Sequence, residues 1–317
     1  MIDSLVQIGS GAPPAPARPR LPEWARRSKT HFESLNGLKR GLRELKLHTV
    51  CEEARCPNIH ECFHRGAATF MILGERCTRG CGFCSVQKLN PRKHDVRLDA
   101  NEPANVARMA RQMNLRYVVI TSVNRDDLED GGSHHFAETV REVRRALPEA
   151  RVEVLTPDFC GRLDAVARVL DAGPHVFNHN METAPRLYSR VRPQADYRQS
   201  LRVLAFARGH AAHISTHASN QVLTKSGFMV GLGETPEEVR TLLRDLRAAG
   251  TDVATIGQYL QPTRRNLPVA EFVEPRQFEE YREYGLALGF KAVFSGPLVR
   301  SSYMADLISD EAQREPC

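Results

Sequence analysis

Apolar residues along this chain follow two alternating patterns. Short apolar runs bounded by polar or turn residues are typical of buried strands, whereas apolar residues that recur at every third or fourth position are typical of amphipathic helices. The first pattern predicts strands over residues 69–73, 117–122, 152–156, 175–179, 227–232 and 253–259. The second predicts helices between them, over residues 104–113, 134–146, 162–172, 197–208 and 236–249. From residue 69 onward the chain is therefore predicted to repeat a strand–helix unit.

Two helices carry further signals. A helix before the repeat is predicted by leucines at helical spacing, namely Leu35, Leu38, Leu42 and Leu45. The helix over 236–249 has the clearest ends: Thr235 can cap it, Glu238 completes a Thr-x-x-Glu capping box and Gly250 can end it.

The repeat predicts the fold class. Parallel strands joined by helices form an α/β sheet with right-handed crossovers, and six such units can curl into a partial (β/α)6 TIM-type barrel. Active sites of these barrels lie at the C-terminal ends of the strands. The polar residues expected there are Thr121, Ser122, Asn124, Arg125 and Asp126, then Asn178, Asn180 and Glu182, then Gly231, Gly233 and Glu234. For each of them, a role as a cap or turn residue is the alternative interpretation.

Composition agrees with a large globular enzyme. The chain has 317 residues, of which 41% are hydrophobic and 26% charged, enough for one domain with a well-buried core. No apolar run approaches the roughly 18 residues of a membrane span, and no apolar signal segment follows the first basic residues, so a cytoplasmic location is expected. The net charge of +6 favours an acidic partner or only solubility.

Six of the eight cysteines form two triplets, Cys51-x4-Cys56-x5-Cys62 and Cys77-x3-Cys81-x2-Cys84. Thiolates select zinc or iron–sulfur clusters, but a structural zinc site usually takes four ligands in paired C-x2-C units, and neither triplet has that form. A disulfide framework is typical of small secreted chains, and a chain of 317 residues does not fit that class. Three thiolates can instead hold a cubane cluster and leave its fourth iron open to a substrate or cofactor.

The second triplet, C-T-R-G-C-G-F-C at residues 77–84, resembles the signature of the radical S-adenosylmethionine (SAM) enzymes. The resemblance implies that the open iron chelates the amino and carboxylate groups of SAM. It further implies that an electron from the cluster cleaves SAM to a 5'-deoxyadenosyl radical.

The rest of the chain is similar to one family of these enzymes, the lipoyl synthases. The resemblance rests on the first triplet, on I-T-S-V-N-R-D-D-L at 120–128, F-N-H-N-M-E-T at 177–183, T-K-S-G-F-M-V-G-L-G-E at 224–234 and V-R-S-S-Y-M-A at 299–305, and it covers roughly residues 45–306.

The resemblance assigns two 4Fe–4S clusters. Cys77, Cys81 and Cys84 would hold the SAM-binding cluster. An auxiliary cluster would be held by Cys51, Cys56, Cys62 and a serine of the R-S-S-Y segment, for which Ser302 is preferred over Ser301. The polar residues expected to contact SAM are Thr121, Ser122, Asn124, Arg125, Asp126, Asn180 and Glu182.

The implied reaction inserts sulfur at C6 and C8 of a protein-bound octanoyl chain. These carbons are unactivated, so a radical must abstract a hydrogen at each, and the auxiliary cluster then donates the sulfur. The implied partners are an octanoylated lipoyl-carrier domain or H protein, an electron donor such as ferredoxin or flavodoxin, and a cluster-repair protein. Neither nucleic acid nor a membrane is expected as a partner.

Four segments are predicted: a mobile Pro/Arg-rich arm (1–30), an N-terminal extension with the auxiliary cysteines (31–68), the barrel (69–290) and a C-terminal segment (291–317). The two extensions are expected to cover the open mouth of the barrel.

Two other functions are alternatives to this interpretation. Another sulfur-inserting radical SAM enzyme, of the biotin synthase or methylthiotransferase type, would lack the R-S-S-Y end. A zinc-binding nucleic-acid module would need interleaved aromatic residues, which make up only 7% of this chain.

Some positions depart from the family pattern. Leu89 stands where Gly is usual and Asn266 where His is expected. The stretch 209–222, with His210, His213 and His217, is predicted to be a solvated loop. Outside the triplets, Cys160 is predicted to be a small residue near a strand end and Cys317 an exposed tail thiol.

Overall fold

The computed structural model describes residues 21–25, 35–53, 58, 61–62, 65–90, 92–94, 97–215 and 222–302. Its centre is a curved sheet with the strand order β1-β2-β5-β6-β7-β8-β9-β10. The short β1 (His48–Thr49), which follows helix α1 (Leu35–Glu44), is antiparallel to β2 (Ala67–Ile72). All other neighbours in this sheet pair in parallel.

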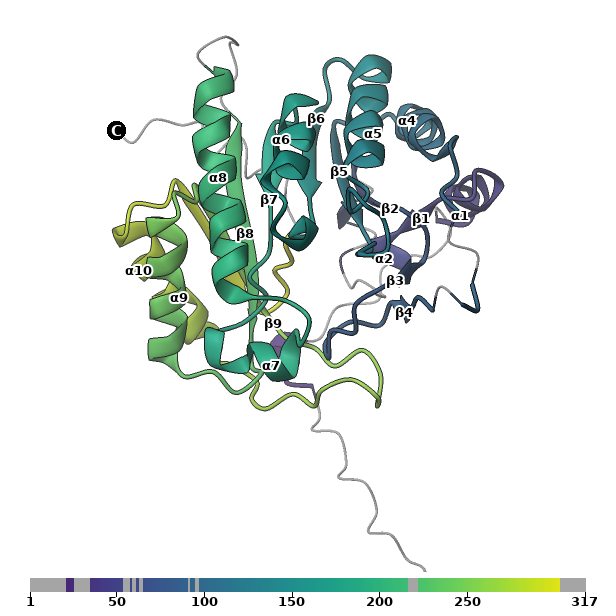
Figure 1. Cartoon of the computed structure of the whole chain (residues 1–317). Coiled ribbons are helices and arrows are strands. Elements are labelled where there is room, and N and C mark those ends of the chain that lie inside the picture. Colours follow the sequence, from purple (N-terminus) through teal and green to yellow (C-terminus); the bar gives the residue numbers. More distant parts are fainter. Residues whose placement is uncertain are drawn as a thin grey trace, which may run out of the picture.

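Helices follow most of the parallel strands and cover the outer face of the sheet (Figure 1). The strands are β5 (Tyr117–Ser122), β6 (Arg151–Leu155), β7 (Val176–Asn178), β8 (Leu223–Val230), β9 (Val253–Gln258) and β10 (Ala292–Gly296). The helices are α4 (Glu102–Gln112), α5 (Ser133–Ala146), α6 (Leu163–Asp171), α8 (Tyr197–Ser215), α9 (Pro236–Ala248) and α10 (Pro275–Ala287). The C-terminal ends of the strands point toward the lower side of Figure 1, where the short α7 (Tyr188–Val191) lies.

The predicted α/β partial barrel is confirmed. All six predicted strands form, and within the described ranges no ladder joins β10 back to β1, so the sheet is an open barrel. Helix α10 and strand β10 were not predicted; β10 pairs with β9 and continues the sheet past residue 290. Of the predicted arm, residues 21–25 are described, and Trp24 packs edge-on against Phe272 with ring centroids 6.4 Å apart.

The ends of α9 are as predicted, but those of α8 are not. Thr235 accepts from the Glu238 amide and Glu238 accepts from the Thr235 amide, which makes the capping box. The predicted loop after residue 208 is wrong up to Ser215, because α8 continues through it. Ala207 and Ala211, one helical turn apart, are fully buried and hold the extension against the core. His217 lies outside the described residues.

Two apolar layers hold the barrel together. The larger one fills the space between the outer face of the sheet and its helices, and includes Phe70, Ile120 and Phe136, all fully buried. The smaller one consists of strand residues from the opposite, inner face, among them Val119, Leu223, Val253 and Ala292. Alternate residues of each strand thus face the two layers, as the pleat requires.

A charged pair lies inside the barrel. Lys225 Nζ is 2.9 Å from Glu153 Oε1, and both side chains are fully buried. Tyr117 Oη and Asn178 Nδ2 each donate to the same carboxylate, at 2.9 Å. Burial lowers the pKa of Lys225, and the Glu153 charge opposes that effect. Three donor groups make four hydrogen bonds to this buried carboxylate, so each partner depends strongly on the others.

Replacing Lys225 by Met should lower the free energy of unfolding by about 3–5 kcal/mol, because Glu153 would stay buried without its cation. Urea unfolding followed by circular dichroism measures this loss. Lys291→Met is the matched control, since Lys291 pairs with Asp252 at 3.5 Å but is 36% exposed. That control should lose less than about 1 kcal/mol. Equal losses in the two variants would contradict the importance of the interior pair.

Candidate active site

The second cysteine triplet lies where the barrel geometry predicts, directly after β2. Its loop begins in β3 (Arg76–Cys77) and returns through β4 (Gln87–Lys88), which pairs with β3 in parallel. The Leu89 amide donates to the Cys77 carbonyl at 2.7 Å, so the loop closes on its own first cysteine. Leu89 therefore supports this turn although it departs from the family pattern.

The three thiols of the loop lie close enough to influence one another. Burial raises the pKa of Cys81 to about 11 and that of Cys84 to about 12, and the charge of Cys77 adds to both shifts. The Asn124 amide donates to Cys77 Sγ at 3.2 Å. Three partly buried thiols with an amide donor on one sulfur fit an iron–sulfur cluster, whose potential depends on such hydrogen bonds and on exposure. Because the neutral thiols cannot ligate, cluster binding must release protons.

Arg79, between the first two cysteines, fixes the loop to the ends of β5 and β6. Its guanidinium donates to Asp126 at 2.8 Å twice, and to Asp158 at 2.7 and 2.9 Å. Burial alone would raise the pKa of Asp158, but the hydrogen bonds and charge of Arg79 outweigh it and lower that pKa to about 2. Gln199 adds a further donor to Asp158 at 3.0 Å. The loop is thus anchored by two paired carboxylates.

The far side of the loop is held by neutral contacts. Gly80 N donates to Gln194 Oε1 at 2.6 Å, and Gly82 N donates to the Val191 carbonyl at 2.8 Å. Asn266 Nδ2 donates to the carbonyl oxygens of Cys84, at 2.9 Å, and Gly82, at 3.3 Å. The Asn that replaces the expected His therefore acts as a clamp on the last cysteine.

Asn180 and Glu182, after β7, form a polar cluster near the loop. Glu182 has a left-handed backbone (φ 66°), and Asn180 Nδ2 donates to its carboxylate at 3.0 Å. Burial raises the pKa of Glu182. Arg192 donates to the Asn180 carbonyl at 2.9 Å, and its charge and that of Glu182 both act on Cys81. A left-handed backbone beside charged groups that lie in the interior is typical of functional sites.

The C-terminal segment reaches the inner face of β8 and β9. Ser301 Oγ lies 2.8 Å from Asn180 Nδ2, and a Cβ added at Gly227 would come within 2.7 Å of that hydroxyl. A Cβ at Gly257 would collide with the Val299 carbonyl. The two strand glycines therefore make room for the segment, as close backbone approach requires.

Most of the other predicted SAM contacts are engaged within the protein. Thr121 Oγ1 donates to the Leu155 carbonyl at 2.9 Å, Arg125 donates to Asp127 at 2.8 Å, and Asp126 accepts from Arg79. Ser122 lies at the end of β5. Cys160 is near the end of β6, as predicted, and its thiol donates to Asp126 at 3.2 Å. SAM binding by these residues stays a prediction.

The first triplet is described in part. Cys62 is half-buried, and its amide donates to the Asn58 carbonyl at 3.0 Å. Cys51 lies in α2 (Val50–Glu53), but its side chain is outside what the structure describes. Cys56 and Cys317 also lie outside the described residues.

Sequence reasoning missed Arg79, Asp158, Gln194 and Arg192. Arg79 had one available signal, since it lies inside the cysteine motif.

Comparisons with known proteins agree on one family. The family model of the radical SAM superfamily matches residues 71–246, and that of the N-terminal domain of lipoyl synthase matches residues 12–56. The lipoyl synthase of Caldicellulosiruptor saccharolyticus is 50% identical over 287 residues, which are 90% of this chain and 96% of that protein. The lipoyl synthase of Rubrobacter xylanophilus is 52% identical over 293 residues, 92% of this chain and 88% of that protein.

The chain belongs to the lipoyl synthase family. Membership in this radical SAM family implies a 4Fe–4S cluster and SAM as cofactors, and it decides against the two alternative functions. A solved structure of HydG, a maturase of the FeFe-hydrogenase, has a TM-score of 0.53 at 12% identity and covers 80% of this chain and 65% of that one. At this low identity, the similarity supports the fold of the chain and says nothing of its function.

Arg79→Lys should loosen the cysteine loop, because an ammonium cannot make the paired contacts of a guanidinium to two carboxylates. We expect a chelator to remove iron about tenfold faster from the reconstituted variant, a size typical of groups that orient metal ligands. Absorbance of the released iron chelate measures this rate. Arg208→Lys is the control, since Arg208 pairs with Asp252 away from the loop, at 3.0 Å. Equal rates for the wild type and Arg79→Lys would rule out the anchoring role.

Proposed function

We propose that this lipoyl synthase inserts two sulfur atoms, at C6 and C8 of a protein-bound octanoyl-lysine, and takes them from an auxiliary 4Fe–4S cluster. Cys77, Cys81 and Cys84 would hold the SAM-binding cluster. Cys51, Cys56, Cys62 and Ser302 would hold the auxiliary one. The chain is a radical SAM enzyme of the sulfur-inserting lipoyl synthase family. The second cluster and its ligands belong to the proposal.

One pair of hydrogen bonds supports the auxiliary site most directly. The Cys62 amide donates to the Asn58 carbonyl at 3.0 Å, and Asn58 Nδ2 donates to the Leu298 carbonyl at 2.9 Å. Asn58 is fully buried. A segment of the first triplet is thereby joined to the start of the R-S-S-Y segment, although the two are 240 positions apart.

The contacts of Ser301 favour Ser302 as the ligand. The Ser301 hydroxyl is bound to both the oxygen and the nitrogen of the Asn180 amide, at 3.0 and 2.8 Å. It also lies against Gly227. Ser301 therefore anchors the segment in the barrel, whereas no hydrogen bond among the described residues engages the Ser302 hydroxyl. An oxygen ligand is harder than thiolate and binds iron less strongly, which suits a cluster that must give up sulfur.

Bound SAM and its cluster supply the radical needed at unactivated carbons, and the auxiliary cluster supplies the sulfur. The protein's own residues bind, orient and shield these groups. Glu182, Asn180 and Arg192 offer a carboxylate, an amide and a cation beside Cys81, which suits the amino and carboxylate groups of SAM. The C-terminal segment over Gly227 and Gly257 restricts the access of water to the mouth.

The family acts on a lipoyl-carrier substrate. For this chain we propose an octanoylated lipoyl-carrier domain or H protein as the partner, ferredoxin or flavodoxin as the electron donor, and a protein that rebuilds the auxiliary cluster. In the part of the chain that the structure describes, no helix is both long and apolar enough to cross a bilayer.

Two cysteine variants should separate the two clusters. Cys81→Ala should abolish the cleavage of SAM to 5'-deoxyadenosine, because two thiolates cannot hold the cluster in place. Cys56→Ala should still cleave SAM but form no lipoyl product, since the radical would find no sulfur. Mass spectrometry of both products, after anaerobic incubation with an octanoyl-lysine peptide, SAM and a reductant, measures each outcome. Wild-type lipoyl yield from Cys56→Ala would falsify the auxiliary site.

The serine variants should separate a ligand from an anchor. Ser302→Ala should retain both clusters, because three thiolates remain at each, but it should slow sulfur insertion by about tenfold or more. Ser301→Ala should have a smaller effect, since it removes one hydrogen-bonded anchor worth about 1 kcal/mol. Iron content and single-turnover rates measure the two effects. A larger loss in Ser301→Ala than in Ser302→Ala would reverse the ligand assignment.

A further inference from the structure

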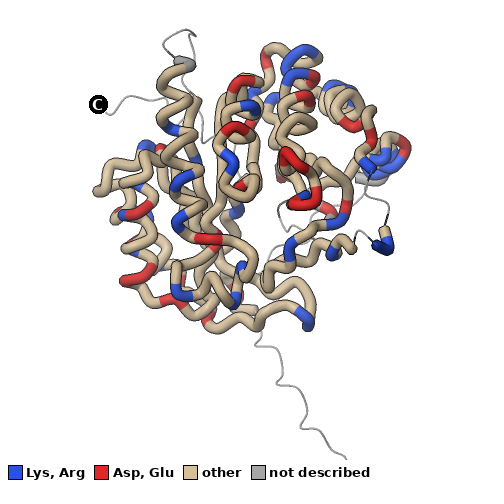
Figure 2. Tube along the Cα trace, in the orientation of Figure 1, with Lys and Arg blue, Asp and Glu red and all other residues tan. Residues whose placement is uncertain are grey.

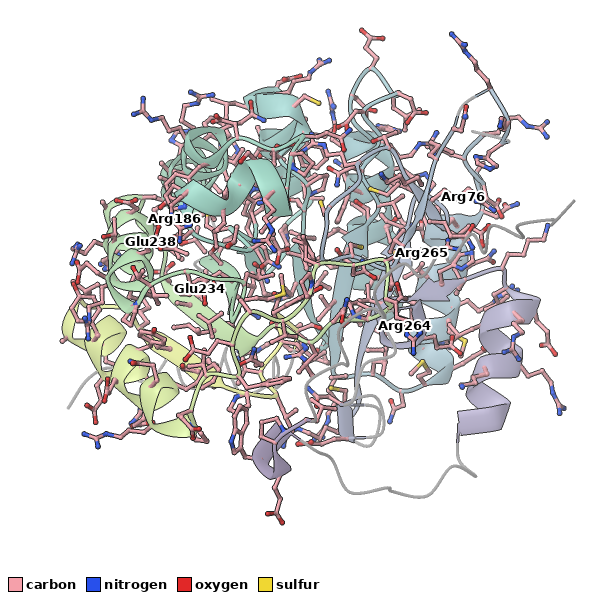
Figure 3. All side chains as sticks on the ribbon, turned by 90° about the horizontal axis from the view of Figure 1, so that it is seen from below. Arg76, Arg186, Glu234, Glu238, Arg264 and Arg265 are labelled. Carbon is pink, nitrogen blue, oxygen red and sulfur yellow. The ribbon has the colours of Figure 1, made fainter. Side chains whose placement is uncertain are left out.

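Charges at the mouth of the barrel differ between its two sides. Figure 3 looks into the mouth, with Arg186, Glu234 and Glu238 on one side and Arg264 and Arg265 toward the other. Arg186 is neutralised by Glu238, with contacts of 2.7 and 2.9 Å. Neither Arg264 nor Arg265 pairs with a carboxylate among the described residues, and both are exposed. The two sides of the mouth therefore present different electrostatic fields to an approaching molecule.

The unpaired cations come from three segments that surround the cysteine loop. Residues 76–94, 183–195 and 259–270 contain no Asp or Glu. Their exposed cations, for which the described structure gives no ion pair, form what we call the basic rim: Lys88, Arg92, Lys93, Arg190, Arg264 and Arg265.

The basic rim is attached to the cysteine loop itself. Next to Arg265, Asn266 donates to the Cys84 carbonyl at 2.9 Å, and the Leu267 amide donates to the Gly82 carbonyl at 2.9 Å. A Cβ added at Gly80 would collide with the Lys88 side chain, so that lysine lies over the loop. Any molecule held by the rim is therefore held beside the proposed SAM cluster.

The segment after β5, which contacts the cysteine loop through Asp126, is acidic, but its charges are largely paired. Asp126 is paired with Arg79, Asp127 with Arg125 at 2.8 Å, and Asp130 lies 3.8 Å from Arg168. Figure 2 shows acidic and basic positions interspersed along the tube. An acidic partner is therefore drawn to the rim, whose cations have no carboxylate partner among the described residues.

We propose that the basic rim is the docking surface for an acidic face of the carrier domain that presents the octanoyl-lysine. This inference rests on the proposed function, because only a protein-bound substrate needs such a surface. A nucleic acid fits the rim less well, since single strands stack on exposed aromatic rings. The three Phe and Tyr residues of the rim segments pack instead in the interior: Phe83 and Tyr259 with Leu267 in one apolar cluster, and Tyr188 in another.

The experiment compares two substrates of the reconstituted full-length enzyme. One is an octanoylated carrier domain with an acidic face, and the other is a short, uncharged octanoyl-lysine peptide. In Arg264→Gln/Arg265→Gln the ratio of kcat/KM for the carrier to kcat/KM for the peptide should fall about tenfold at low ionic strength and less at high salt. The control Arg111→Gln/Arg144→Gln removes the same charge from the exposed helix surface of α4 and α5 and should keep the wild-type ratio.

The outcomes separate this inference from the proposed function. If the wild type converts neither substrate, the proposed function fails. If the peptide is converted but the ratio in Arg264→Gln/Arg265→Gln equals that of the wild type, or falls equally in the control, the rim is not the docking surface. A single-stranded oligonucleotide whose binding is lost in the rim variant, while the ratio stays unchanged, would overturn the proposal in favour of a nucleic-acid partner.

Discussion

The cysteine loop depends on one buried guanidinium, that of Arg79. The loop has little regular structure, so its hydrogen bonds must come from elsewhere, and Arg79 draws Asp126 and Asp158 onto it from two neighbouring strand ends. Burying a cation costs free energy that only close carboxylates offset. Because both carboxylates follow strands of the sheet, their bonds to Arg79 hold the loop in a fixed position on the barrel. The thiols can then stay in place when no metal holds them.

The interior of the barrel changes character along its axis. Near the N-terminal ends of the strands, apolar residues such as Val119 and Leu223 fill it completely. Next comes the Lys225–Glu153 pair, and beyond it Gly227 and Gly257 leave room that the C-terminal segment occupies. Along the barrel axis, apolar side chains are thus followed by a charged pair and then by glycines. The open end is available to cofactors because the layers below it already stabilise the sheet.

What the sequence predicts well is encoded locally. The six strands are short apolar runs, which is why all six were predicted. Strand β10 was missed because its sequence, A-V-F-S-G, is short and half polar, and the end of α8 was missed because Gly209 and the histidines resemble a loop. Arg79 could not be assigned, since its partners lie 47 and 79 positions away. Only folding reveals that they meet.

The bond from Asn58 to Leu298 has a consequence for synthesis of the enzyme. The seven parallel strands of the large sheet lie between these two residues, so the ribosome exposes Asn58 on the order of tens of seconds before Leu298 is made. The Cys77–Cys84 loop has its last contact at Asn266 and Leu267, and it can be complete earlier. During translation, the contacts of this loop can therefore form before the Asn58–Leu298 bond does.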